Sequence, residues 1–124
     1  MFKVMFVLCL PEGMNRQESL RYWQHSHGPL AAKVPGTRRY VQHHAVGAPE
    51  GEPPFLGIAT LEFDSEQAWL EGAASPEMAT AVADLVNFAD PERLPTLFVE
   101  DATIVDWRPA GGARSFNTTE ITSP

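Results

Sequence analysis

Four short apolar runs in the chain have the character of β-strands. They are rich in Val, Ile, Phe and Leu, and proline or glycine lies at or near their ends, as expected of strands bounded by turns. The first run is apolar at nearly every position, which indicates a strand buried on both faces. The predicted strands are residues 2–10, 38–46, 56–63 and 96–107.

Helical segments separate these strands. Asn15, with Glu18 three residues later, forms a capping-box pattern that starts the first helix. Pro29 lacks a backbone N–H, so we expect the helix to kink or restart there. Asp64 and Ser75 are the start signals of a broken helix and of a further helix. The resulting order, β-α-β-β-α-β, predicts an α+β, ferredoxin-like fold with its helices on one sheet face.

Helices on one face leave the other sheet face bare in a single copy. A domain within 124 residues buries about two-thirds of its unfolded surface, and an apolar sheet face left in water would be costly. We therefore predict a homodimer in which two sheets pack face to face, a dimeric α/β barrel. We divide the chain into a domain at residues 1–107 and a Gly-, Ser- and Thr-rich tail at 108–124, ordered only if it packs on a neighbour.

One polar residue falls within the apolar stripe of the first helix. Leu20, Trp23, Leu30 and Val34 recur at helical spacing, and His27 lies among them. A buried imidazole must be hydrogen-bonded or neutral, because an unpaired polar group in a core costs roughly 1–3 kcal/mol. Such a histidine serves either packing or chemistry, and its near-neutral pKa suits acid–base catalysis.

The second predicted strand supplies partners for this histidine. Tyr40 follows a Pro-Gly turn, and its hydroxyl can donate to a developing oxyanion. Gln42 and His44 share the strand face of Tyr40 and are expected to line the same cleft, with Trp23 as an apolar wall. Together with His27 they predict proton transfer next to a carbonyl. The alternative is a structural histidine bonded to Tyr40 or to a backbone carbonyl.

Composition narrows the partners and the compartment. The net charge is −7, with 16 acidic against 9 basic residues, so neither nucleic acid nor an acidic lipid surface is expected to bind. The single cysteine, Cys9, cannot form an internal disulfide and is expected to be a small buried hydrophobe. No apolar run approaches the roughly 20 residues of a membrane span. We expect a cytoplasmic protein.

The histidine spacing does not favour a metal site. A helix presents two ligands at i and i+4, whereas His25 and His27 are at i and i+2, and His43 and His44 project to opposite strand faces. We expect His25 to face solvent. The sequence contains no Gly-rich phosphate loop, and we expect neither a metal nor another cofactor.

A set of short motifs in the first half of the chain resembles the EthD-domain family. They are Tyr22-Trp23, His27-Gly28-Pro29-Leu30, Pro35-Gly36 and Tyr40-Val41-Gln42-His43. The resemblance covers residues 2–107 and implies a dimeric α/β barrel with a small-molecule cleft between sheet and helices. Members of this family are associated with ether degradation and with decarboxylation or dehydration of aromatic polyketides.

The chain is also similar, more distantly, to methylmuconolactone isomerases. This resemblance maps their catalytic histidine and tyrosine onto His27 and Tyr40. Their catalytic cysteine aligns near Leu61, which cannot act as an acid or base, so that particular isomerisation is not expected. Many EthD-like sequences carry an acidic residue at the position of Thr60, which adds Thr60 to the expected substrate-binding residues.

These observations predict a cofactor-independent lyase or isomerase acting on a hydrophobic oxygenated compound. His27 is the expected general base or acid, and Tyr40 is the expected oxyanion donor. The expected reactions are enolisation, decarboxylation, dehydration or cyclisation of an aromatic polyketide or a lactone. Two alternatives remain: a non-catalytic binding or accessory protein for an oxygenase or ether-degradation pathway, and a cofactor-free monooxygenase.

Overall fold

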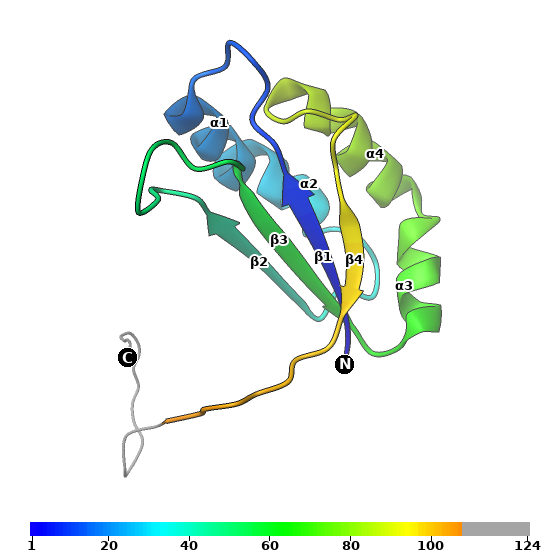
Figure 1. The fold of residues 1–124 in the computed structure, drawn as a ribbon. Helices are drawn as coiled ribbons and strands as arrows, with labels where there is room; N and C mark the ends of the chain where they lie inside the picture. The colour runs from blue at the N-terminus through cyan, green and yellow to red at the C-terminus, as the bar shows by residue number, and fades with distance from the viewer. Residues whose placement is uncertain (108–124) are drawn as a thin grey trace.

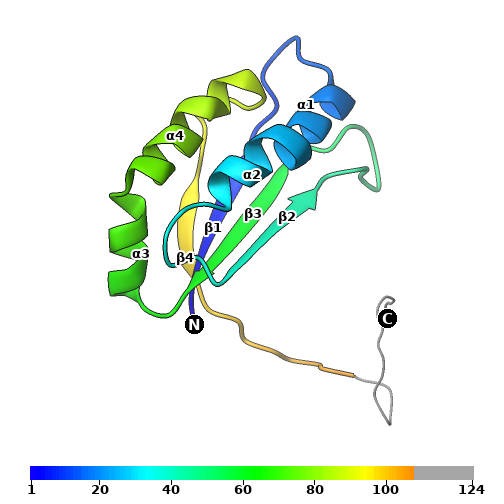
Figure 2. The same ribbon diagram turned by 180° about the vertical axis from the view of Figure 1, so that it is seen from behind.

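A four-stranded antiparallel sheet forms one layer of the molecule, and the helices of the described chain form the other (Figure 1, Figure 2). The structure, a computed structural model, describes residues 1–107. The strand order across the sheet is β2-β3-β1-β4. The strands are β1 (Phe2–Leu8), β2 (Arg39–His44), β3 (Gly57–Phe63) and β4 (Thr96–Val99). The predicted ferredoxin-like α+β fold is confirmed, and the predicted tail lies outside the described residues.

The helical layer is built from short pieces. They are α1 (Arg16–Tyr22), the π-helical turn η1 (Trp23–His27), α2 (Gly28–Ala31), α3 (Glu66–Ala73), α4 (Pro76–Asp84) and the 3₁₀ turn η2 (Leu85–Asn87). The predicted cap of α1 is confirmed, because the Asn15 side chain accepts the N–H of Glu18 at 2.9 Å. The predicted start of α4 is also confirmed, with Ser75 as its cap and Pro76 at its first position.

The start of α3 differs from the prediction by one residue. Ser65, not Asp64, caps this helix by accepting the N–H of Ala68. The carboxylate of Asp64 instead pairs with the guanidinium of Arg38 at 2.9 Å. A hydroxyl and a carboxylate are both good helix caps. Because the carboxylate of Asp64 is engaged in the exposed ion pair with Arg38, Ser65 caps the helix instead.

Three strands, β1, β2 and β4, end earlier than predicted because their partners end. His44, the last residue of β2, pairs with Gly57, the first residue of β3, so β2 stops before the predicted residue 46. Val99 in β4 pairs with Lys3, and β1 begins at Phe2, so, within the described part of the chain, residues 100–107 have no neighbouring strand that could continue the ladder. The predicted strand 96–107 is therefore wrong beyond Val99. At the other end of β1, Leu8 pairs with Gly57, the first residue of β3, so β1 stops two residues before the predicted Leu10.

The core lies between the sheet and the helices. Trp23, Phe63 and Phe88 are its largest fully buried side chains, and Cys9 is buried as expected. Gly57 lets both β2 and Trp23 approach β3 closely, since a Cβ at position 57 would clash with the backbone carbonyl oxygen of His43 and come within 2.7 Å of the indole ring. The same indole stacks on His44 of β2, with ring centroids 4.8 Å apart. This packing brings the helical layer close to the candidate site residues.

Candidate active site

His27 is the last residue of the π turn between α1 and α2. The backbone N–H of Gly28 donates to the carbonyl of Trp23, five residues earlier, instead of to the carbonyl four residues earlier. Pro29 has no N–H to offer the carbonyl of His25, so an uninterrupted α-helix would lose a hydrogen bond here in any case. Turns of this kind are rare and are frequent at functional sites. The turn leaves His27 only 6% exposed, beneath the helical layer.

The imidazole of His27 is bonded to a carboxylate that the sequence interpretation did not identify. Nδ1 of His27 lies 3.0 Å from Oδ2 of Asp84, the last residue of α4. An ionised carboxylate only accepts hydrogen bonds, so Nδ1 carries the proton and Nε2 keeps its lone pair. Burial lowers the pKa of His27 below its usual 6.5, although Asp84 opposes the shift. The imidazole is therefore neutral at pH 7, in the tautomer that a general base requires.

Asp84 is held in place by three donors. Its Oδ1 accepts the hydroxyl of Tyr22 at 2.7 Å and the side-chain amide of Asn87 at 2.9 Å, while Oδ2 accepts from His27. Burial alone would raise the pKa of Asp84, but these hydrogen bonds outweigh it and lower the pKa. A base oriented by a fixed, ionised acceptor is the arrangement that activates imidazoles in many hydrolytic sites.

Tyr40 is oriented by a chain of hydrogen bonds along β2. Nε2 of Gln42 donates to the Tyr40 hydroxyl at 2.7 Å and to the carbonyl of Trp23 at 2.9 Å, and Oε1 of Gln42 accepts from Nε2 of His44 at 2.8 Å. An amide NH₂ only donates, so the Tyr40 oxygen is an acceptor here and its own proton remains for a further partner. Burial raises the pKa of Tyr40, which keeps the hydroxyl protonated.

Gly28 makes the contact between helix and strand possible. A Cβ at position 28 would lie 3.2 Å from Nε2 of Gln42, closer than a side chain normally packs. The helix therefore approaches β2 closely enough for one amide to bond both Trp23 and Tyr40. The two candidate residues His27 and Tyr40 thus sit on elements that are fastened to each other.

His27 and Tyr40 line one cavity between the sheet and the helices, here called the inner cavity. Its enclosed volume is about 60 Å³, and all the empty space out to its open mouth amounts to about 480 Å³. Apart from His27 and Tyr40, its described lining is apolar. Trp23 lies on its wall, together with side chains from β1, β3, α2, the turn after α2, and α4. They include Phe6, Leu8, Leu61, Val34, Met78 and Val82. This is the character of a small-molecule site: apolar walls and two polar groups.

The other predicted substrate-binding residues lie elsewhere. Gln42 and His44 line an outer hollow, also bordered by Gln24 and Pro29, and only Tyr40 among the predicted residues borders both spaces. Thr60 is on the opposite face of the sheet, because its neighbour Leu61 in β3 lines the inner cavity and adjacent strand residues alternate. The structure therefore does not bring Thr60 to this cavity.

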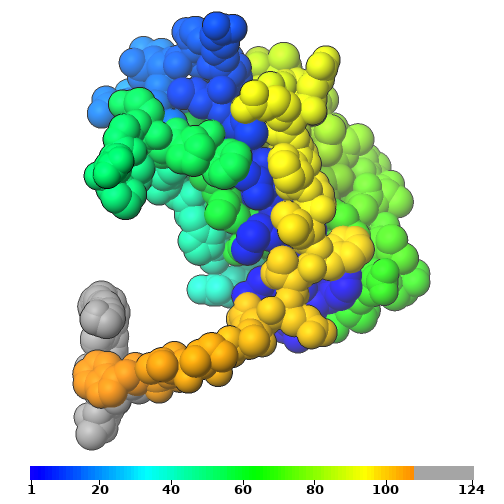
Figure 3. Space-filling view, viewed as in Figure 1, coloured from blue at the N-terminus to red at the C-terminus, as the bar shows by residue number. Residues whose placement is uncertain are grey.

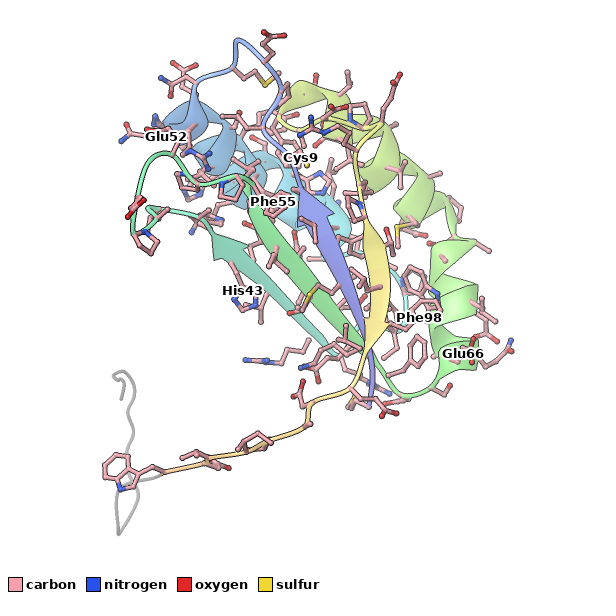
Figure 4. The ribbon with its side chains drawn as sticks, viewed as in Figure 1. Cys9, His43, Glu52, Phe55, Glu66 and Phe98 are labelled. Carbon is pink, nitrogen blue, oxygen red and sulfur yellow. The ribbon has the colours of Figure 1, made fainter. Side chains whose placement is uncertain are left out.

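The remaining histidines stand apart from the site. His25 is exposed on η1, and His43 projects from β2 on the sheet face away from the helices (Figure 4). Within residues 1–107, no three His, Cys, Asp or Glu side chains are grouped so that they could hold a metal ion. In the same part of the chain, no helix combines the length and the apolar character needed to cross a bilayer.

A sequence signal for Asp84 does exist. Ala81, Asp84, Leu85 and Phe88 follow one another at helical spacing, and all except Asp84 are buried and apolar or small. An acidic residue in such a stripe is as informative as the histidine in the first helix. Its partner lies 57 residues away, so only the fold joins the two observations.

Comparisons with known proteins indicate the family of the chain. Residues 11–92 match the family model described as the EthD domain. An uncharacterized 11.0 kDa protein from the thcB-thcC intergenic region of Rhodococcus erythropolis is 27% identical over 84 residues, which is 68% of this chain and 81% of that protein.

Solved structures share the fold. The crystal structure of an EthD family protein from Bacillus halodurans has a TM-score of 0.68 and 22% identity, and the match covers 82% of this chain and all of that one. A dimeric ferredoxin-like protein of unknown function from Thermobifida fusca has a TM-score of 0.62 at 12% identity, over 79% of this chain and 88% of that one.

Proposed function

The chain belongs to the EthD domain family, and on that premise we propose that it is a cofactor-independent acid–base enzyme for a small hydrophobic carbonyl compound. The observation that carries the proposal is the hydrogen bond from Nδ1 of His27 to Asp84, at the wall of an otherwise apolar cavity. A neutral acceptor would be enough to satisfy a buried histidine that serves packing alone, whereas here the acceptor is an ionised carboxylate. Such a partner holds the tautomer of a base and stabilises the cation that forms when the base takes a proton.

The proposed reaction begins with removal of a proton from the carbon next to the carbonyl. Nε2 of His27 takes the proton, the C–H electron pair forms the enolate, and the hydroxyl of Tyr40 donates a hydrogen bond to the enolate oxygen. Asp84 stabilises the imidazolium. His27 then returns the proton to another carbon, giving an isomer, or to a departing hydroxyl, giving water and an unsaturated product. In a substrate with a second carbonyl, the enolate carbon instead bonds to that carbonyl carbon, whose C=O π pair moves to its oxygen, and His27 returns the proton to the resulting alkoxide.

The same residues also fit the alternative of a non-catalytic binder, because a cavity that holds a substrate also holds a ligand. The two functions differ in what Nε2 of His27 does. A base transfers a proton and appears in the rate, typically with a 10²–10⁴-fold contribution. A structural or binding histidine appears in affinity or stability alone.

We also propose that the protein is a homodimer that buries the sheet face opposite the helices. This face, here called the open face, presents mainly half-buried or exposed apolar side chains. They are Met5, Val7, Val41, Ile58, Leu97 and Val99. The Thermobifida fusca relative is described as dimeric, which supports a second copy as the cover. Two sheets packed face to face would remove these side chains from water.

The test of the proposed activity is exchange of carbon-bound hydrogen with solvent. Aryl ketones, 1,3-diketones and unsaturated lactones are incubated in D₂O with the wild type, His27→Ala and His25→Ala, and deuterium entry beside the carbonyl is followed by NMR. His25 is a matched control because it is exposed, two residues away, on the same turn. We expect His25→Ala to exchange like the wild type and His27→Ala to lose about 10²–10⁴-fold in rate.

The pH profile supplies a second criterion. The exchange rate should rise with pH through the pKa of His27, which burial places below 6.5, and then level off. Exchange by His27→Ala at the wild-type rate would remove His27 from the mechanism. Ligand binding without exchange by the wild type, weakened in His27→Ala, would instead establish a binding protein.

A further inference from the structure

The charge of the candidate site can be counted from its described residues. His27 and Tyr40 are the two polar members of the described lining, and that lining includes neither lysine nor arginine. Directly behind His27 lies the carboxylate of Asp84, whose side chain is only 11% exposed. The inner cavity therefore has one formal negative charge at its polar wall and no described cation facing it.

Neighbouring groups keep this charge in place. The titratable groups around His27 in the described chain are Asp84 on α4, Tyr22 on α1, which is bonded to the same carboxylate, and Tyr40 on β2 across the cavity. The pKa of Tyr22 is raised by its hydrogen bond to Asp84, and the pKa of Tyr40 is raised by burial, so both phenols stay neutral. Neutral His27 leaves the carboxylate of Asp84 uncompensated.

A ligand that carries a carboxylate would meet two penalties here. It would lose hydration on entering an apolar cavity without gaining a counter-charge, and it would be repelled by Asp84 through a medium of low dielectric constant. The protein's net charge of −7 also lowers the concentration of anions near its surface. A neutral ketone or ester meets neither penalty, and its carbonyl oxygen needs only the hydrogen bond that Tyr40 can donate.

We infer that the inner cavity selects neutral carbonyl compounds and rejects carboxylates of the same shape. The inference rests on the proposed function and narrows it: enolisation, dehydration or aldol-type closure of an uncharged compound fits the site, and decarboxylation of an acid does not. The supplier of such a substrate must therefore be a reaction that releases a neutral ketone, ester or lactone.

The test uses ligands matched in shape and different in charge. Binding of 4-acetylbenzoate, its methyl ester and its primary amide is measured by calorimetry at pH 7.5. We expect the ester and the amide to bind at least about tenfold more tightly than the carboxylate, and Asp84→Asn to narrow this ratio. Glu77→Gln is the matched control, since it removes the same charge from an exposed position on α4 and should leave the ratio unchanged.

Lower pH gives an independent readout on the wild type. The affinity of the ester and the amide relative to that of the carboxylate should fall as His27 takes a proton below pH 6.5, because the imidazolium then offsets the charge of Asp84. Asp84, whose pKa is lowered, stays ionised in this range. If the carboxylate binds as tightly as the ester and the amide at pH 7.5, or if Glu77→Gln changes the ratio as much as Asp84→Asn, the inference is overturned. Absence of binding by all three at millimolar concentration also overturns it.

Failure of the inference and failure of the proposed function are distinguishable. Tight binding and deuterium exchange of the carboxylate would remove the charge selectivity and keep the acid–base activity. Selective binding of the neutral ligands, without deuterium exchange in any of the three ketones, would keep the selectivity and remove the activity.

Discussion

The two faces of the sheet carry similar side chains in different surroundings. On the face toward the helices, Val4, Leu61 and Phe63 are at most 4% exposed. On the open face, Leu97 is 45% exposed, and Met5 and Ile58 are only half-buried. Figure 3 views the molecule from the side of this face. Alternate residues of the same strands are thus covered more fully on the helix side than on the open face, where most apolar side chains stay partly exposed.

The two faces are therefore expected to have different roles: one in folding and in the candidate site, and the other in contact with a second copy. The helix-covered face holds the core, the inner cavity and the His27–Asp84 pair. The charged side chains of the open face lie at one end of it, where Oε2 of Glu62 is 3.9 Å from Nζ of Lys3 and 3.5 Å from a guanidinium nitrogen of Arg39. The rest of that face is mostly apolar, which suits a second copy better than water. Substitutions on the two faces should therefore change different measurements.

The largest effect is expected on the open face, for Ile58→Lys. In an interface between identical copies the substitution appears twice, so two ammonium groups would be buried against apolar side chains. We expect the dimer dissociation constant to rise about a thousandfold, or about 4 kcal/mol, by analytical ultracentrifugation. Val86→Lys is the control, since Val86 is 59% exposed outside the open face. An unchanged dimer in Ile58→Lys, with a folded circular dichroism spectrum, would remove this face as the interface.

The next effect is expected on the helix-covered face, for Gly57→Ala. The added Cβ would clash with the backbone carbonyl oxygen of His43 on β2 and would lie 2.7 Å from the ring of Trp23, so that both the strand pair and the indole would have to shift. We expect a loss of about 1–3 kcal/mol in the free energy of unfolding, measured by urea denaturation. Gly47→Ala is the control, because a Cβ at position 47 has no atom within 4 Å. Equal stability of the two variants would contradict the close packing of Trp23 on β3.

The smallest effect is expected in the pH dependence of folding stability, which arises from histidines on the helix-covered side of the sheet. The pKa of His27 is lower in the folded chain than its usual 6.5, so below pH 6.5 the unfolded chain binds more protons and stability falls as pH falls. His44 has a lowered pKa and adds the same sign. We expect the melting temperature to decrease between pH 7 and pH 5, with a shallower slope in His27→Gln.

The fold and part of the site could be predicted from the sequence because they depend on local patterns. Strand and helix signals gave the correct element order, and the stripe that contains His27 identified a buried imidazole correctly. Asp84 was missed because its meaning comes from a contact across 57 residues. Thr60 was assigned to the cleft by resemblance, yet a shift of one residue along a strand changes the face, and Leu61 is the residue that reaches the cavity.

The end of β4 shows the same limit. Residues 100–107 include Ile104, Val105 and Trp107 and have the composition of a strand, but a strand needs a partner, and β1 offers none beyond Phe2. Phe98, the last aromatic residue of β4, still packs beside Phe2, with ring centroids 4.9 Å apart, near α3 (Figure 4). Local composition predicted the start of this strand, and the length of its neighbour determines its end.

The π turn has a consequence for how one carboxylate is shared. Tyr22 and His27 are five residues apart, and in an uninterrupted α-helix such residues point about 140° apart around the axis. A turn closed between residues five apart brings them to the same side, and both side chains then reach Asp84, one at each carboxylate oxygen. The wider turn thus acts as a one-residue shift of helical phase, and a single acidic group on α4 receives a phenol and an imidazole that a regular helix would keep apart.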